Sequence, residues 1–304
     1  MLRPADRPRP PCDQCSGCVD MKSLDVKTHG GEAGGMAEPA WDPAQYLRHA
    51  GDRARPFTDL LARVPDPAAA APRVADLGCG PGTLTALLAD RWPAARVTGY
   101  DNSPQMLDRA RRHAGPTRGG GRLEFVHADA RTWTPDGPHD LIVSNATLQW
   151  VPDHAALFPA WTDALTPGGT LAFQVPGNFD APSHRLMRDL AGTPRWRTRL
   201  AGVLRHDDAV LTPAAYLDRL TALGCTADVW ETTYVHLLTG EDAVLDWVKG
   251  TALRPVLTAL DDDPAARDAF VDAYRAALRR AYPAGPRGTP FPFRRVFAVA
   301  RRPA

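Results

Sequence analysis

One short segment, residues 74–82, restricts the possible fold of this chain more than any other. It reads Val-Ala-Asp-Leu-Gly-Cys-Gly-Pro-Gly, so an apolar run containing Asp76 leads into Gly78, Gly80 and Gly82. The apolar residues suit a buried parallel strand, and glycines allow positive φ and close approach of a ligand to the backbone. A leucine-rich helix is expected next, and the N–H groups of its first turn are open to a ligand.

The glycine spacing is G-x-G-x-G rather than the G-x-G-x-x-G of dinucleotide-binding loops, and Thr83 follows. A pyrophosphate is therefore not the favoured ligand. Preceded by Val-Ala-Asp-Leu, the loop resembles motif I of the class I S-adenosylmethionine-dependent methyltransferases. The alternative is a glycine-rich turn between a strand and a helix of any α/β protein.

Acids recur at the ends of the following strands. The predicted strand 96–101 ends at Asp101, 19 residues beyond Gly82, where an acid can accept both hydroxyls of a ribose. Alternatively Asp101 only starts a turn, because Ser103 caps the next helix. The strand 123–127 leads to Asp129, and the strand 139–145 is expected to continue through residue 150. By the resemblance, Asp129 lies beside the adenine amino group.

Strands and helices alternate five times up to residue 175, which predicts a parallel sheet with helices on both faces. We expect a Rossmann-like, doubly wound α/β fold with a seven-stranded, mostly parallel sheet. The remaining predicted elements are a helix at 153–165, a strand at 170–175, a helix at 212–224, a strand at 225–237, helices at 241–260 and 264–282, and a strand at 293–301.

The chain of 304 residues has 36 basic and 35 acidic side chains, a formal charge of +1. This balance gives no general attraction to nucleic acid or to anionic lipid. Since no apolar run reaches the ~18 residues needed to cross a bilayer, we expect a cytoplasmic protein without a membrane partner. Only three of the basic residues are lysines. An arginine is therefore weak evidence of function by itself.

Residues 1–38 are rich in proline, glycine and charge, and we expect a disordered tail there. Cys12, Cys15 and Cys18 form C-x-x-C-x-x-C, which could hold part of a cluster or a metal. No fourth cysteine followed by proline completes that pattern, so no metal is expected. Residues 39–304 should form the catalytic domain, with lid insertions at about 177–211 and 238–290.

Further motifs narrow the resemblance to one family, that of the trans-aconitate 2-methyltransferases, from about residue 41 to residue 302. They are Trp41-Asp42-Pro43-x-x-Tyr46, Arg53-x-Arg55-Pro56, Ala75 to Gly82, Ser144-Asn145-Ala146-Thr147-Leu148-Gln149-Trp150, Asp246-Trp247-Val248 and Leu253-Arg254-Pro255. The tail before residue 39 lies outside the pattern, and residues 288–293 differ from it.

The resemblance implies methyl transfer from S-adenosylmethionine to a carboxylate oxygen of a small polycarboxylic acid, giving a monomethyl ester and S-adenosylhomocysteine. A carboxylate with a pKa near ~4 is ionised at neutral pH, so no general base is required. The residues expected around the cofactor are Tyr46, Arg55, Asp76, Gly78, Gly80, Asp101, Asn102, Asp129, Ala130 and Asn145.

For the acceptor, Arg254 is expected to bind a carboxylate, because an arginine fork suits a carboxylate better than a lysine does. The other expected acceptor residues are Gln149, Trp150, Tyr234, His236 and Trp247. Core packing is the alternative for the aromatic residues, and a surface position is the alternative for Arg254.

Two other functions remain open from the sequence. One is carboxyl methylation of a malonyl group on a carrier protein, and the other is binding of S-adenosylmethionine without catalysis. In each case we expect a monomer or a weak dimer.

Overall fold

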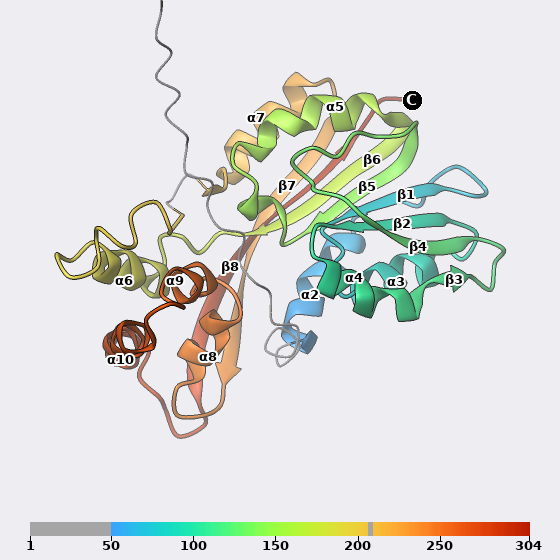
Figure 1. The fold of residues 1–304 in the computed structure, drawn as a ribbon. Helices are drawn as coiled ribbons and strands as arrows, with labels where there is room; N and C mark the ends of the chain where they lie inside the picture. Colours follow the sequence, from blue (N-terminus) through green and yellow to red (C-terminus); the bar gives the residue numbers. More distant parts are fainter. Residues whose placement is uncertain (1–49, 206–208) are drawn as a thin grey trace, which may run out of the picture. The chain divides into compact units, whose positions relative to one another are not determined.

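An eight-stranded sheet runs through the computed structural model, which describes residues 50–205 and 209–304 (Figure 1). The strand order is β3-β4-β2-β1-β5-β6-β8-β7. The five strands from β4 to β6 pair in parallel, whereas β3, β8 and β7 pair antiparallel with their neighbours. The strands are β1 (Arg73–Leu77), β2 (Arg96–Asp101), β3 (Gly115–Pro116), β4 (Arg122–His127), β5 (His139–Asn145), β6 (Leu165–Pro176), β7 (Thr226–Leu238) and β8 (Thr289–Arg301).

Helices cover both faces of this sheet (Figure 1). On one face α2 (Ala50–Leu61), α3 (Thr83–Arg91) and α4 (Pro104–Ala110) lie over the strands, and Phe57 and Leu88 share a core with Val74. On the other face α5 (Phe158–Asp163) and α7 (Pro213–Ala222) bury Trp161 and Tyr216. The predicted α/β class with a mostly parallel, doubly wound sheet is confirmed, and the two-residue β3 is added to the seven strands expected.

Some predicted boundaries are wrong. β5 ends at Asn145 instead of running to residue 150, because Ala146 takes a left-handed φ of 55° and residues 148–150 form a short 3-10 helix. The helix expected at 153–165 is split into a 3-10 turn, His154–Leu157, and α5. The segment 241–260 is likewise two helices, α8 (Ala243–Lys249) and α9 (Arg254–Ala259).

β7 and β8 extend past the end of β6. Pro176, the last residue of β6, pairs with Arg295, so residues 289–294 of β8 and 233–238 of β7 continue as a two-stranded ribbon. At ~3.3 Å per residue the ribbon is about 20 Å long. Because β6 is parallel to β1 and β5, the ribbon lies beyond the carboxyl ends of the parallel strands.

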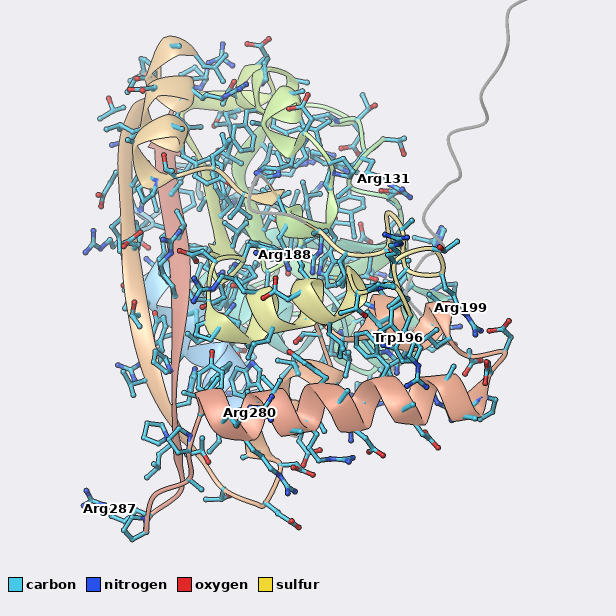
Figure 2. All side chains as sticks on the ribbon, turned by 90° about the vertical axis from the view of Figure 1, so that its left-hand side faces the viewer. Arg131, Arg188, Trp196, Arg199, Arg280 and Arg287 are labelled. Carbon is cyan, nitrogen blue, oxygen red and sulfur yellow. The ribbon has the colours of Figure 1, made fainter. Side chains whose placement is uncertain are left out.

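A second hydrophobic core forms around this ribbon. It joins Leu238 and Phe291 to residues of α6 (Pro182–Ala191), α8, α9 and α10 (Pro264–Ala281). α6 and α10 pack side by side, and Trp196 lies with them (Figure 2). These helices come from the two segments, 177–211 and 238–290, in which insertions are expected.

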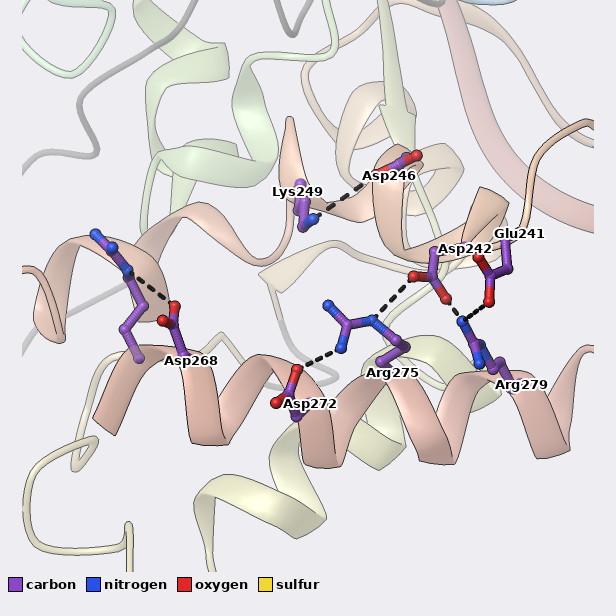
Figure 3. A network of polar contacts seen from close by, with 9 residues as sticks. Glu241, Asp242, Asp246, Lys249, Asp268, Asp272, Arg275 and Arg279 are labelled. Atoms are coloured by element: carbon purple, nitrogen blue, oxygen red, sulfur yellow. Dashed lines mark hydrogen bonds and ion pairs between the residues drawn. The ribbon is translucent and has the colours of Figure 1, made fainter. Parts of the chain in front are cut away.

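Ion pairs fasten α10 to the start of α8 (Figure 3). The Asp242 carboxylate, in the residue before α8, lies 2.9 Å from Arg275 Nε and 2.8 Å from Arg279 Nε. Arg279 also contacts Glu241 at 2.9 Å. Since these side chains are partly exposed, the network adds modestly to the hydrophobic packing.

Among the described residues, no helix combines the length and the hydropathy needed to cross a bilayer.

Candidate active site

The glycine loop after β1 is held against the neighbouring strand. The backbone N–H groups of Gly78 and Cys79 both donate to the carbonyl oxygen of Tyr100, at 2.8 and 3.0 Å. Gly78 has a φ of 79°, and a Cβ there would lie 1.9 Å from Thr147 Oγ1. A Cβ on Gly80 would meet no atom within 4 Å. The loop is therefore closed on the side of Thr147 and open beside Gly80.

Asp76 lies beneath this loop and is buried, with its Oδ2 accepting a hydrogen bond from Thr85 Oγ1 at 2.7 Å. Burial, with a smaller contribution from the nearby Asp101 carboxylate, raises the pKa of Asp76 to about 7, although the hydrogen bond from the Thr85 hydroxyl opposes the shift. A cationic ligand group close to Asp76 would favour its ionised form.

Asp101, the last residue of β2, joins the glycine loop to the next helix. Its Oδ2 accepts from the Gly80 N–H at 2.8 Å and its Oδ1 accepts from the Ser103 N–H at 2.9 Å. Burial raises the pKa of Asp101, and these two N–H groups counteract the shift. Each carboxylate oxygen can accept a second hydrogen bond, which suits the two hydroxyls of a ribose.

The third acid, Asp129, lies in the turn after β4. It pairs with Arg131, whose Nε donates to Asp129 Oδ2 at 2.7 Å, and that bond holds the pKa of Asp129 below its usual value. Ala130 lies between these two residues. Asn102 follows Asp101, and its carbonyl oxygen lies 3.1 Å from His127 Nε2. The acids at the ends of β2 and β4 thus lie on adjacent parallel strands.

The turn after β5 holds two buried acceptors. Asn145 Oδ1 and Gln149 Oε1 have no hydrogen-bond donor among the described residues. Gln149 Nε2 donates to the Ala146 carbonyl at 2.6 Å, so the amide is fixed in place. An unpaired buried acceptor costs about 1–3 kcal/mol. At Asn145 the turn therefore fits a ligand that carries N–H or O–H donors.

The ribbon supplies two further predicted residues on its buried side. Tyr234 donates its hydroxyl to Asp59 Oδ2 of α2 at 2.6 Å, and the Arg55 guanidinium lies 5.1 Å from the centre of the Tyr234 ring. His236 lies 4.7 Å, ring centre to ring centre, from Trp247 of α8. Trp247 is only 1% exposed and belongs to the second core, as the packing alternative expects.

Arg254 is the first residue of α9 and is partly buried. Tyr46 lies outside the described residues, as do Cys12, Cys15 and Cys18.

The sequence interpretation missed one residue beside the predicted ones, Arg205. Its guanidinium lies 3.5 Å from the centre of the Trp150 ring, and its Nη1 donates to the Gln149 carbonyl at 2.8 Å. No signal in the sequence singles it out, because it follows an irregular segment of a chain in which most basic residues are arginines.

Comparisons with known proteins agree with this arrangement. The family described as "Methyltransferase domain" matches residues 74–169. A trans-aconitate 2-methyltransferase of Streptomyces coelicolor is 79% identical over 265 residues, covering 87% of this chain and 88% of that protein. The protein of the same name from Streptomyces avermitilis is 71% identical over 268 residues, covering 88% of this chain and 99% of that protein.

Among solved structures, an S-adenosylmethionine-dependent methyltransferase of Geobacter sulfurreducens in complex with S-adenosyl-L-homocysteine is 20% identical, with a TM-score of 0.48. The match covers 86% of this chain and 99% of that one. The family rests on the Streptomyces relatives, whose identity and coverage are high. The chain belongs to the trans-aconitate 2-methyltransferase family.

Proposed function

We propose that this chain transfers a methyl group from S-adenosylmethionine to one carboxylate oxygen of trans-aconitate, giving the monomethyl ester and S-adenosylhomocysteine. The observation that carries the proposal is the identity of 79% and 71% to two proteins of that name, each matched over nearly its whole length.

The cofactor site that we propose follows the carboxyl ends of β1, β2, β4 and β5. Asp101 accepts hydrogen bonds from the ribose hydroxyls. Asp129 and Ala130 lie beside the adenine, and Asn102 borders the adenine ring. Gly78 and Gly80 allow close approach, and Asp76 and Asn145 face the cationic methionine end. The open space beside Gly80 and the unpaired Asn145 Oδ1 support this fit.

Arg55 and Tyr46 are proposed to close over the methionine end of the cofactor. The position of Arg55 above the ring of Tyr234 supports this role, because α2 then joins the cofactor site to the ribbon. Tyr46 rests on the sequence alone.

When bound, S-adenosylmethionine supplies an activated methyl group on a sulfonium. The acceptor carboxylate is ionised at neutral pH, so the protein needs no catalytic base. Its residues act by holding the carboxylate oxygen in line with the methyl carbon and sulfur, since well-oriented reactants gain roughly 7–11 kcal/mol.

For the acceptor we propose Gln149, Trp150, Tyr234 and His236 as contacts, with Arg254 binding a carboxylate and Trp247 supporting His236. The helices of 177–211 and 238–290 form a lid over this site, within a catalytic domain of residues 39–304. Their place beyond the carboxyl ends of the parallel strands supports the lid, because ligands of open α/β sheets bind at that edge. We further propose a cytoplasmic monomer or weak dimer, without nucleic-acid or membrane partners.

The test is incubation of the purified full chain with methyl-labelled S-adenosylmethionine and one acceptor at a time. We expect a labelled monomethyl ester with trans-aconitate and none with malonyl carrier protein. Labelling of the carrier protein without trans-aconitate ester would replace the proposal. Absence of turnover with every acceptor, despite cofactor binding, would favour a binding protein.

A further inference from the structure

A small cavity lies between α6, the start of α9 and the segment that ends at Arg205. Its volume is about 10 Å³, room for about one water molecule, and Phe179, His184, Arg188, Arg205 and Pro255 are among its lining residues. His184 and Arg188 are four residues apart on α6, so they share one helix face. Figure 2 shows Arg188 on this helix. The cavity thus receives two guanidinium groups from separate segments of the chain.

Arg205 is fixed on one side of this cavity. Its guanidinium stacks on Trp150, at 3.5 Å from the ring centre, and lies 5.2 Å from the centre of the Phe179 ring. One nitrogen, Nη1, donates to the Gln149 carbonyl at 2.8 Å. A guanidinium has five N–H donors, so most of its donors remain for another acceptor.

No carboxylate within residues 50–205 or 209–304 forms an ion pair with Arg205, and burial alone lowers its pKa to about 9. Burial also lowers the pKa of His184 to about 3, so that the imidazole is neutral and adds no charge. The exposed Asp180 carboxylate opposes this lowering of the His184 pKa but does not reverse it. Arg205 is partly exposed, so a guanidinium with most of its donors unused can bind an anionic group such as a carboxylate.

The position of Arg205 connects it to the proposed reaction. Gln149 and Trp150, its two partners, follow Asn145 directly after the carboxyl end of β5. Ligands of doubly wound sheets bind outside these strand ends. An anion held by Arg205 would therefore lie beside the turn that we assign to the acceptor.

We propose that Arg205 binds one carboxylate of the acceptor and thereby helps to select polycarboxylates. Trp150 orients the guanidinium by stacking, and the Gln149 carbonyl fixes its rotation. This inference rests on the proposed function and adds a residue to it, because a tricarboxylate can engage Arg205 and Arg254 with different carboxylates.

The test compares Arg205→Gln and Arg205→Lys with the wild-type chain and with Arg280→Gln, a control at an exposed arginine of α10 (Figure 2). We expect Arg205→Gln to raise the KM for trans-aconitate roughly 30-fold or more, while the Kd for S-adenosylmethionine changes less than about threefold. Arg205→Lys should recover part of the loss, since it keeps the charge but not the fork.

Three dicarboxylates that each lack a different carboxylate of trans-aconitate sharpen the test: itaconate, glutaconate and mesaconate. Their inhibition constants are measured with wild type and Arg205→Gln. The substitution should weaken two of them strongly and leave one, which lacks the carboxylate bound by Arg205, within about threefold. An equal effect on all three, or none on any, would overturn the assignment.

Calorimetric binding of trans-aconitate to the chain loaded with S-adenosylhomocysteine gives a readout that does not depend on turnover. If wild type binds trans-aconitate but forms no ester, the proposed function fails. The ratio of the trans-aconitate Kd of Arg205→Gln to that of wild type still tests the role of Arg205. A ratio near one, or an effect confined to the Kd of S-adenosylmethionine, would refute it. Thermal melting identifies any variant that does not fold. If Arg205→Gln does not fold, the trans-aconitate Kd of Arg205→Lys is compared with that of wild type instead.

Discussion

Replacement of Asp101 by alanine separates two roles of one carboxylate. In the structure its two oxygens accept hydrogen bonds from the N–H groups of Gly80 and Ser103, at 2.8 and 2.9 Å. Alanine leaves both N–H groups without this acceptor, which should cost stability. It also removes two proposed charge-assisted bonds to the ribose. At roughly 1.5 kcal/mol each, these bonds correspond to about 3 kcal/mol, or ~150-fold in the Kd for S-adenosylmethionine.

The assay is calorimetric titration with S-adenosylmethionine, with thermal melting of the free protein beside it. Asp101→Asn keeps one acceptor oxygen and should lie between wild type and Asp101→Ala in both measurements. Asp108→Ala, at an exposed carboxylate of α4, is the matched control and should leave the Kd unchanged. If Asp101→Ala lowers the melting temperature but shifts the Kd less than threefold, the carboxylate only fastens the loop and the ribose assignment is wrong.

Three further predictions follow from the same region and from the helical cover. Gly78→Ala should abolish cofactor binding, because the φ of 79° and the overlap with Thr147 Oγ1 at 1.9 Å both oppose a Cβ; wild-type affinity in the calorimeter would contradict this. Asp76 keeps its proton up to a pH of about 7 in the folded protein but only up to about 3.8 in the unfolded one. Its contribution to stability therefore decreases as the pH rises from 3.8 to 7. Between pH 5 and pH 8 the free energy of unfolding of the wild type, measured with urea, should therefore fall by about 3 kcal/mol relative to that of Asp76→Asn. The same pH dependence in both proteins would refute the shift. Asp242→Asn should lower the melting temperature by only about 2 °C, since its ion pairs are partly exposed, and a much larger loss would show that the network carries the packing.

The parallel half of the sheet could be predicted because its signals are local. β2 ends at Asp101 and β5 begins at His139, as the apolar runs and their terminal acids indicate. The N-cap at Ser103 is also found, with its hydroxyl accepting from the Met106 N–H at 3.4 Å. Buried strands and caps depend on adjacent residues, so the sequence pattern is sufficient there.

Other boundaries depend on contacts between distant segments. The apolar run after Asn145 looks like more strand, yet the left-handed Ala146 turns the chain so that Leu148 enters the core that contains Trp161 and Tyr216. Nothing in the local pattern requires that turn. β7 agrees with the strand expected at 225–237, but β8 begins at Thr289 rather than at residue 293. Its first residues lie in the ribbon, which helices from two distant segments cover.

The residues of the candidate site likewise fall into two groups, those that the local sequence identifies and those that it does not. Asp76, Asp101 and Asp129 are recognisable because each follows a strand, and parallel strands bring their carboxyl ends together. Arg205 follows no periodic segment, and only the stacking on Trp150 reveals its place. Residues that are positioned by tertiary packing have no spacing by which the sequence alone could identify them.

The central claim is that the acceptor atom is a carboxylate oxygen of trans-aconitate. The most direct measurement is a reaction with methyl-labelled S-adenosylmethionine, followed by product mass, S-adenosylhomocysteine yield and mild alkaline hydrolysis. The account predicts one methyl group per S-adenosylhomocysteine, a product one methyl heavier than trans-aconitate, and release of the label as methanol, because an ester is base-labile. Label that resists alkali, or S-adenosylhomocysteine formed only with other acceptors, would contradict it.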